Sequence, residues 1–161
     1  MSNATPLDAL RASKLAPELT EPQLQTLAGH VAFRDLKPGE VLVHEGTSDN
    51  HLYVVVEGAL GVIRNAGGKD SVTLLTLAPG DLVGELSFID ATPHYASLVA
   101  IAPTRVFGLE REEMEAMLVK DPELVYHVMR AIVRTVHQIQ RRLSMQSYEL
   151  TNYIYKQHGR Y

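Results

Sequence analysis

Residues 80–97 combine a glycine-led turn, a carboxylate and an imidazole at a spacing that suits anion binding. The segment from Gly84 to Ile89 is too short for an ordinary helix but fits one tight helical turn. Backbone N–H groups at the start of such a turn can bind an anion, and the glycine lets a ligand come close. After Pro93, a strand rich in Val, Leu and Ile is predicted at 95–101. A phosphate could therefore lie between the turn and this strand, although Gly-Glu-Leu is also a common turn sequence.

Three ordered motifs resemble the signatures of cyclic nucleotide-binding domains. The first is the stretch 80–97, where Gly-Glu-Leu and a later strand of small residues are similar to the phosphate-binding cassette of that family. The other two are segments 38–46 (PGEVLVHEG) and 52–58 (LYVVVEG). The resemblance runs from about Leu7 to the C-terminal helix. It implies a mainly β fold, an antiparallel jelly roll (double-stranded β-helix) with N-terminal helices and a long C-terminal helix.

The same resemblance implies a regulatory sensor that binds cAMP or cGMP, and it assigns roles within the cassette. Gly84 and the N–H groups after it would approach the cyclic phosphate and ribose. Glu85 would accept a hydrogen bond from the ribose 2′-hydroxyl, which suits an ionised carboxylate because it only accepts. The structural alternative for Glu85 is a first-turn glutamate stabilised by the helix dipole. The ligand-binding residues expected in the cassette are Val83, Gly84, Glu85, Leu86, Ser87, His94, Tyr95 and Ala96.

The base of the nucleotide should meet the long C-terminal helix. Position in that helix makes Thr135, Gln138, Ile139 and Arg142 the candidates, and the sequence does not choose among them.

His94 stands where the family motif has arginine. An arginine would make a forked, charged contact with phosphate, whereas an imidazole has at most two donors. With an ordinary pKa of about 6.5, it is only partly charged near neutral pH. Tyr95 replaces a small residue and could crowd the pocket. Three outcomes stay open: His94 binds phosphate weakly and better at acid pH, the pocket takes another ligand, or the domain is a ligand-free interaction or scaffold module.

Short strands separated by turns are predicted throughout residues 30–110, a pattern typical of a β-sandwich or barrel. The predicted strands are 31–36, 41–44, 51–56, 59–64, 71–76, 95–101 and 103–109. Two helices are predicted before them. The first covers 6–15, and the second begins after Thr20, has Gln23 in a capping box and ends near Gly29.

Residues 111–119 are predicted to form a short helix, and a long one follows from Pro122 to about Tyr155, with Asp121 as its N-cap. The long helix carries a coiled-coil-like seam of mostly apolar or small residues at Val125, Val128, Ile132, Thr135, Ile139, Arg142 or Leu143, Gln146 and Leu150. A helix of near ten turns can hardly be buried by one small domain. The 122–155 helix is therefore expected to form a homodimer; the alternative is a helix that lies across the sheet.

The length of 161 residues suits one domain, 1–161, with N-terminal helices at 5–29, the jelly roll at 30–110 and C-terminal helices at 111–158. The net charge of −4 argues against a nucleic-acid surface spread over the whole protein. The absence of cysteine excludes disulfides and cysteine-ligated clusters. No run is apolar enough for a bilayer and no signal-peptide core is present, so a cytoplasmic protein without membrane contact is expected. Residues 2–4 resemble an expression-tag remnant.

Enzyme and metal signatures are missing from the sequence, so neither catalysis nor a cofactor is expected. Some relatives of the fold are haem sensors, but nothing marks His44 or His94 as an axial ligand. No winged helix-turn-helix follows the long helix. Its arginines (Arg130, Arg134, Arg141 and Arg142) are expected on solvated faces, so direct DNA binding is not expected. The downstream partner, expected to be a protein, is not identified by the sequence.

Overall fold

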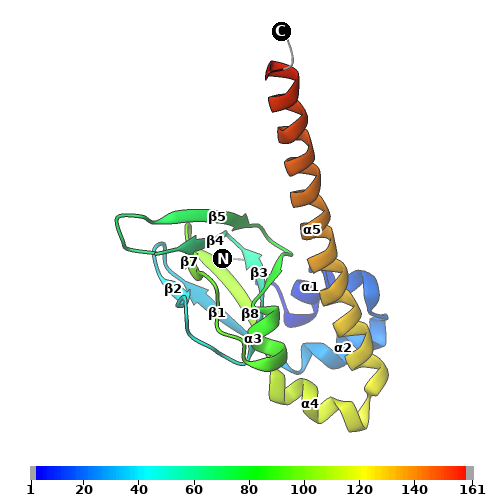
Figure 1. Ribbon diagram of the computed structural model, residues 1–161. Helices are drawn as coiled ribbons and strands as arrows, with labels where there is room; N and C mark the ends of the chain where they lie inside the picture. Colours follow the sequence, from blue (N-terminus) through cyan, green and yellow to red (C-terminus); the bar gives the residue numbers. More distant parts are fainter. Residues whose placement is uncertain (1–2, 159–161) are drawn as a thin grey trace.

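The computed structural model describes residues 3–158, so that Ser2 of the tag-like segment lies outside the described residues. Two four-stranded antiparallel sheets face each other, and the helices gather on one side of them (Figure 1). The first sheet has the order β1 (Val31–Leu36), β8 (Thr104–Glu110), β3 (His51–Glu57) and β6 (Leu82–Val83). The second has the order β2 (Val41–Val43), β7 (Ser97–Ala100), β4 (Leu60–Arg64) and β5 (Val72–Leu77). The predicted jelly-roll class is confirmed.

Strand β3 is buried on both faces, which explains its unbroken apolar run. Leu52 and Val54 belong to the core beneath the helices. Tyr53 and Val55 point the other way, into the core between the two sheets. Strand β6, which pairs with Tyr53 and Val54 of β3, was not predicted, because two residues are too few to form a periodic pattern.

The N-terminal helices are α1 (Pro6–Arg11), the 3₁₀ turn η1 (Ala16–Glu18) and α2 (Glu21–Ala28). The prediction of one helix over 6–15 was wrong, since α1 ends at Arg11. The Ser13 hydroxyl donates to the Leu10 carbonyl and accepts from the Leu15 N–H, and such local bonds compete with helix continuation. The predicted capping box of Thr20 and Gln23 is present.

At the C-terminal end, α4 (Arg111–Lys120) is followed by α5 (Pro122–His158), a single helix of 37 residues. The Asp121 side chain accepts from the Leu124 N–H at 3.1 Å, as an N-cap does. The first part of α5 packs on its own domain, where Leu124, Val128 and Ile132 are buried. The rest projects away from the sheets (Figure 1). The prediction of one continuous coiled-coil-like seam was therefore wrong for the first half of α5. There, packing within the chain buries four of the seam residues: Val125, Val128, Ile132 and Thr135.

Side chains of the N-terminal segment contact the first half of α5. Glu18, whose side chain is 9% exposed, accepts from Arg130 Nε at 2.7 Å and contacts Arg134 Nε at 2.7 Å. His127 Nδ1 lies 2.9 Å from the Gln23 side-chain oxygen. Two of the four arginines expected on solvated faces thus form ion pairs, although their side chains remain partly exposed. Over the described part of the chain, no helix has the length and apolar character needed to span a bilayer.

Candidate functional site

The cassette turn is built around Gly84, which ends β6 and caps α3 (Glu85–Asp90). Gly84 has a φ of 86°, a left-handed conformation that side-chain-bearing residues rarely adopt. A Cβ at this position would lie 3.1 Å from the His51 carbonyl oxygen and 3.7 Å from His94 Cε1. The turn therefore needs glycine both for its dihedral angle and for the close approach of the His51 carbonyl of β3.

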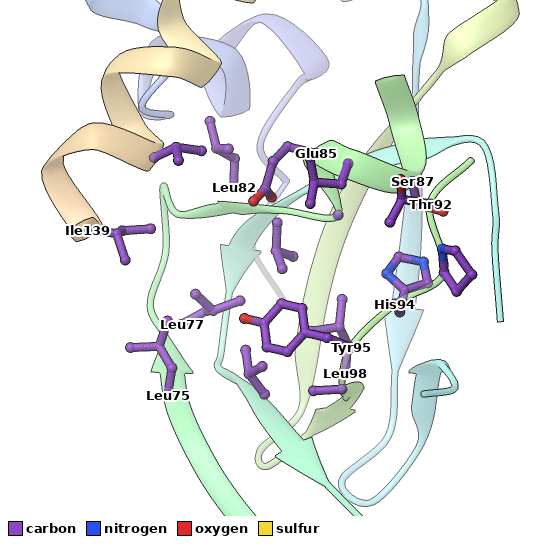
Figure 2. A pocket seen from close by; sticks show the side chains of 17 residues that line it. Leu75, Leu77, Leu82, Glu85, Ser87, Thr92, His94, Tyr95, Leu98 and Ile139 are labelled. Carbon is purple, nitrogen blue, oxygen red and sulfur yellow. The ribbon is translucent and has the colours of Figure 1, made fainter. Parts of the chain in front are cut away.

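A cavity of about 140 Å³ opens between this turn, the segment that follows it and α5 (Figure 2). All of the residues expected in the cassette line it: Val83, Gly84, Glu85, Leu86, Ser87, His94, Tyr95 and Ala96. Its other lining residues are mostly apolar and come from the strands, the segment after α3 and α5: Val62, Leu75, Leu77, Leu82, Thr92, Pro93, Leu98, Val136 and Ile139. The cassette and the long helix therefore share one cavity.

The candidates for base contact divide between this cavity and a neighbouring one of about 230 Å³ between β5 and α5. Ile139 lines both, whereas Thr135 and Arg142 line only the neighbouring cavity. Thr135 is buried, and its hydroxyl donates to the Ala131 carbonyl of its own helix. Gln138 lines neither cavity: Ile139 faces the sheets, and Gln138, one residue earlier on the helix, does not share that face. Val136 was missed, although its spacing of three residues from Ile139 was the available signal.

Asp49, which the sequence did not point to, connects the parts of the cassette. His94 Nε2 lies 3.3 Å from Asp49 Oδ1, and the His94 side chain is only 8% exposed. The Tyr53 hydroxyl donates to Asp49 Oδ2 at 2.8 Å. The Ser87 hydroxyl accepts from the Asp49 N–H and donates to the Asp49 carbonyl, at 2.8 and 2.9 Å. The histidine that replaces the family arginine thus already has a carboxylate partner.

Glu85 and Tyr95 contribute a carboxylate and a hydroxyl to the lining of the cavity. Burial raises the pKa of the Tyr95 hydroxyl, and the negative charge of Glu85 raises it further. Figure 2 shows the Tyr95 ring pointing into the cavity, with its hydroxyl on the side of Leu77. Among the lining residues in the described part of the chain there is no lysine or arginine. Residues 3–158 also contain no cluster of three or more His, Cys, Asp or Glu that could hold a metal ion.

A family model for the cyclic nucleotide-binding domain matches residues 33–121, which is more than half of the chain. The cyclic AMP receptor protein of Thermus thermophilus is 30% identical over 136 residues, covering 84% of this chain and 61% of that protein. A CRP-like cAMP-activated global transcriptional regulator of Mycobacterium tuberculosis is 24% identical over 110 residues, covering 68% of this chain and 49% of that protein. The chain thus spans about half to three fifths of the length of these curated relatives.

Among solved structures, the N-terminal domain of a transcriptional regulator from Streptomyces coelicolor is similar, with a TM-score of 0.71 and 28% identity. The match covers 84% of this chain and 95% of that one.

Replacing Gly84 by alanine should lower the free energy of unfolding by about 1–3 kcal/mol, because the left-handed dihedral and the His51 carbonyl both oppose a Cβ. Gly67→Ala is the matched control: its φ is 81°, but a Cβ there meets nothing within 4 Å. Urea unfolding should show the larger loss for Gly84→Ala. Equal losses would mean that the close approach to β3 has no energetic weight.

The Tyr95 hydroxyl should titrate above the ordinary tyrosine pKa of about 10. Glu85→Gln should lower this pKa by removing the nearby negative charge, but not to the ordinary value, because burial is the larger cause. NMR titration of ring-labelled tyrosine measures the shift. Asp90→Asn, which removes a carboxylate of the same helix that bonds to Thr92, should leave the Tyr95 pKa unchanged. An unaltered pKa in Glu85→Gln would contradict the expectation.

Proposed function

The chain belongs to the cyclic nucleotide-binding domain family, and we propose that it is a homodimeric sensor that binds a cyclic nucleotide and relays binding through α5. One observation carries this proposal: the cassette residues and the apolar side chains of α5 line the same cavity. A ligand in that cavity would touch the turn at Gly84 on one side and Val136 or Ile139 on the other. Binding and helix position would then be coupled.

The ligand would be held at three places. Glu85 supplies acceptors for ribose hydroxyls, and the first N–H groups of the turn after Gly84 lie where the cyclic phosphate would approach. The base, adenine or guanine, would lie on the apolar side chains of β5 and α5. Relatives whose names refer to cyclic AMP support this assignment of ligand class.

The relay would be a shift between two populations of α5 positions. Val136 and Ile139 line the cavity from α5, and the end of this helix projects away from the sheets (Figure 1). A ligand that contacts these two side chains stabilises the helix position in which the contacts form. A protein partner would recognise the new position of α5 at the projecting part of this helix or at the protein surface next to it.

Dimerisation is supported by the apolar side chains that the projecting helix exposes. Leu143 and Leu150 are both 60% exposed, and Tyr153 is exposed as well. Together with Gln146 they follow the 3-4-3 spacing at which helices pair in a coiled coil. The dimer would therefore form through the second half of the helix expected to dimerise, because the first half packs on its own domain.

The alternative function is a ligand-free dimeric scaffold. The observation in its favour is the contact of His94 with Asp49, together with a cavity whose described lining has no lysine or arginine for a phosphate.

Calorimetric titration with cAMP and cGMP tests the sensor directly. Wild type should bind weakly, because an imidazole has at most two donors and cannot make the forked contact that an arginine makes with a phosphate. His94→Arg should bind about 10- to 150-fold more tightly, since it adds a charged hydrogen bond to the phosphate. In thermal melts, a nucleotide should raise the melting temperature of the protein only if that nucleotide binds the folded state. Failure of both wild type and His94→Arg to bind either nucleotide would favour the ligand-free scaffold instead.

Leu150→Glu should convert the dimer to a monomer, because it places a charge within the proposed apolar seam. Met145→Glu is the matched control, since Met145 is 53% exposed on the same helix but lies off the seam. Sedimentation velocity should show dissociation for Leu150→Glu alone. A wild-type monomer at high concentration, or equal effects of both changes, would contradict the proposed dimer.

A further inference from the structure

We infer that the cavity prefers an uncharged nucleoside-like ligand to the corresponding cyclic phosphate, and that Asp49 sets this preference through His94. The inference rests on the proposed function, because it concerns the same cavity. It goes further by naming the charge of the ligand and a residue outside the cavity lining that decides it.

The first step is the surplus of negative charge around the cavity. Glu85 lines it and, within residues 3–158, makes no hydrogen bond or ion pair with another side chain. Asp49 Oδ1 lies 3.3 Å from His94 Nε2, and His94 and Glu85 both line the cavity. Whether His94 is protonated or neutral, the three groups together carry a net negative charge. A phosphate placed among them would meet repulsion where the family arginine would have supplied attraction.

The second step concerns the cations on the elements around the cavity. Arg111 donates to the Ser87 carbonyl at 3.3 Å and lies 3.9 Å from both Glu112 and Glu115. Lys14 and Arg142 line the neighbouring cavity, and Lys14 is paired with Asp81. None of these three side chains lines the cavity itself.

The third step is what the cavity does offer. The Glu85 carboxylate has lone pairs available for O–H or N–H donors, and a half-buried carboxylate gains from such donors. Leu75, Leu98 and Ile139 provide apolar walls, and the Tyr95 ring adds an aromatic surface on which a planar ring can stack. A planar heterocycle joined to a sugar with adjacent hydroxyls satisfies both requirements without any charge.

Asp49 acts on the ligand through His94 and is thus a positioning residue. Its carboxylate binds the imidazole on one oxygen and the Tyr53 hydroxyl on the other, and its backbone is tied to Ser87 of α3. Asp49→Asn keeps an acceptor oxygen in place but removes the negative charge next to His94. This change should therefore alter the preference between charged and uncharged ligands more than it alters the cavity itself.

Calorimetry at pH 7.5 with adenosine, guanosine, cAMP and cGMP tests the inference. In wild type at least one nucleoside should bind about 10-fold or more tightly than its own cyclic phosphate. Asp49→Asn and His94→Arg should each raise cyclic nucleotide affinity by about 10-fold or more, and by a larger factor than they change nucleoside affinity. Glu113→Gln, which removes an equal charge from the distant pair with His30, should change neither. Circular dichroism melts verify that each variant is folded.

The outcomes separate the two proposals. Cyclic nucleotides that bind wild type as tightly as the nucleosides, or more tightly, would overturn the inference and leave the sensor intact. A nucleoside preference that persists in both Asp49→Asn and His94→Arg would overturn the role given to Asp49. Failure of all four compounds to bind any variant would overturn both the inference and the sensor.

Discussion

Burial of β3 on both of its faces is the constraint on which the rest of the structure depends. Leu52 and Val54 anchor the helical layer that includes the first part of α5, while Val55 anchors the second sheet. The same strand pairs with β6 and so fixes the point from which Gly84 starts the cassette. Tyr53 of β3 also holds Asp49, and through it His94. Fold and site therefore share one structural element.

The sequence predicts local structure well where side chains cap or punctuate the backbone. Thr20 with Gln23, and Asp121 before Pro122, mark helix starts that the structure contains. It fails where tertiary contacts decide. The end of α1 depends on the hydroxyl bonds of Ser13, and β6 exists because β3 offers it a partner. The seam of α5 has one spacing throughout, yet packing divides it into a buried half and an exposed half.

The cassette residues could be placed in one cavity from the sequence because they are adjacent along the chain and the motif fixes their geometry. Asp49 could not, since it lies 45 residues before His94 and no local pattern distinguishes it from other loop acids. The face of α5 that meets the cavity was only partly predictable. Its rotation is set by contacts made far from the cavity, at Leu124 and Val128, which determine that Val136 and Ile139 point inward.

The attachment of α5 at Glu18 has a mechanical consequence. The ion pairs with Arg130 and Arg134 hold the helix just before it reaches the cavity, so this position acts as a pivot. At about 1.5 Å of rise per residue, Ile139 lies roughly 8 Å beyond Arg134, and the end of α5 lies roughly 36 Å beyond it. A helix that stays straight is a lever with unequal arms. A displacement at Ile139 would be magnified between four- and fivefold at the far end of α5.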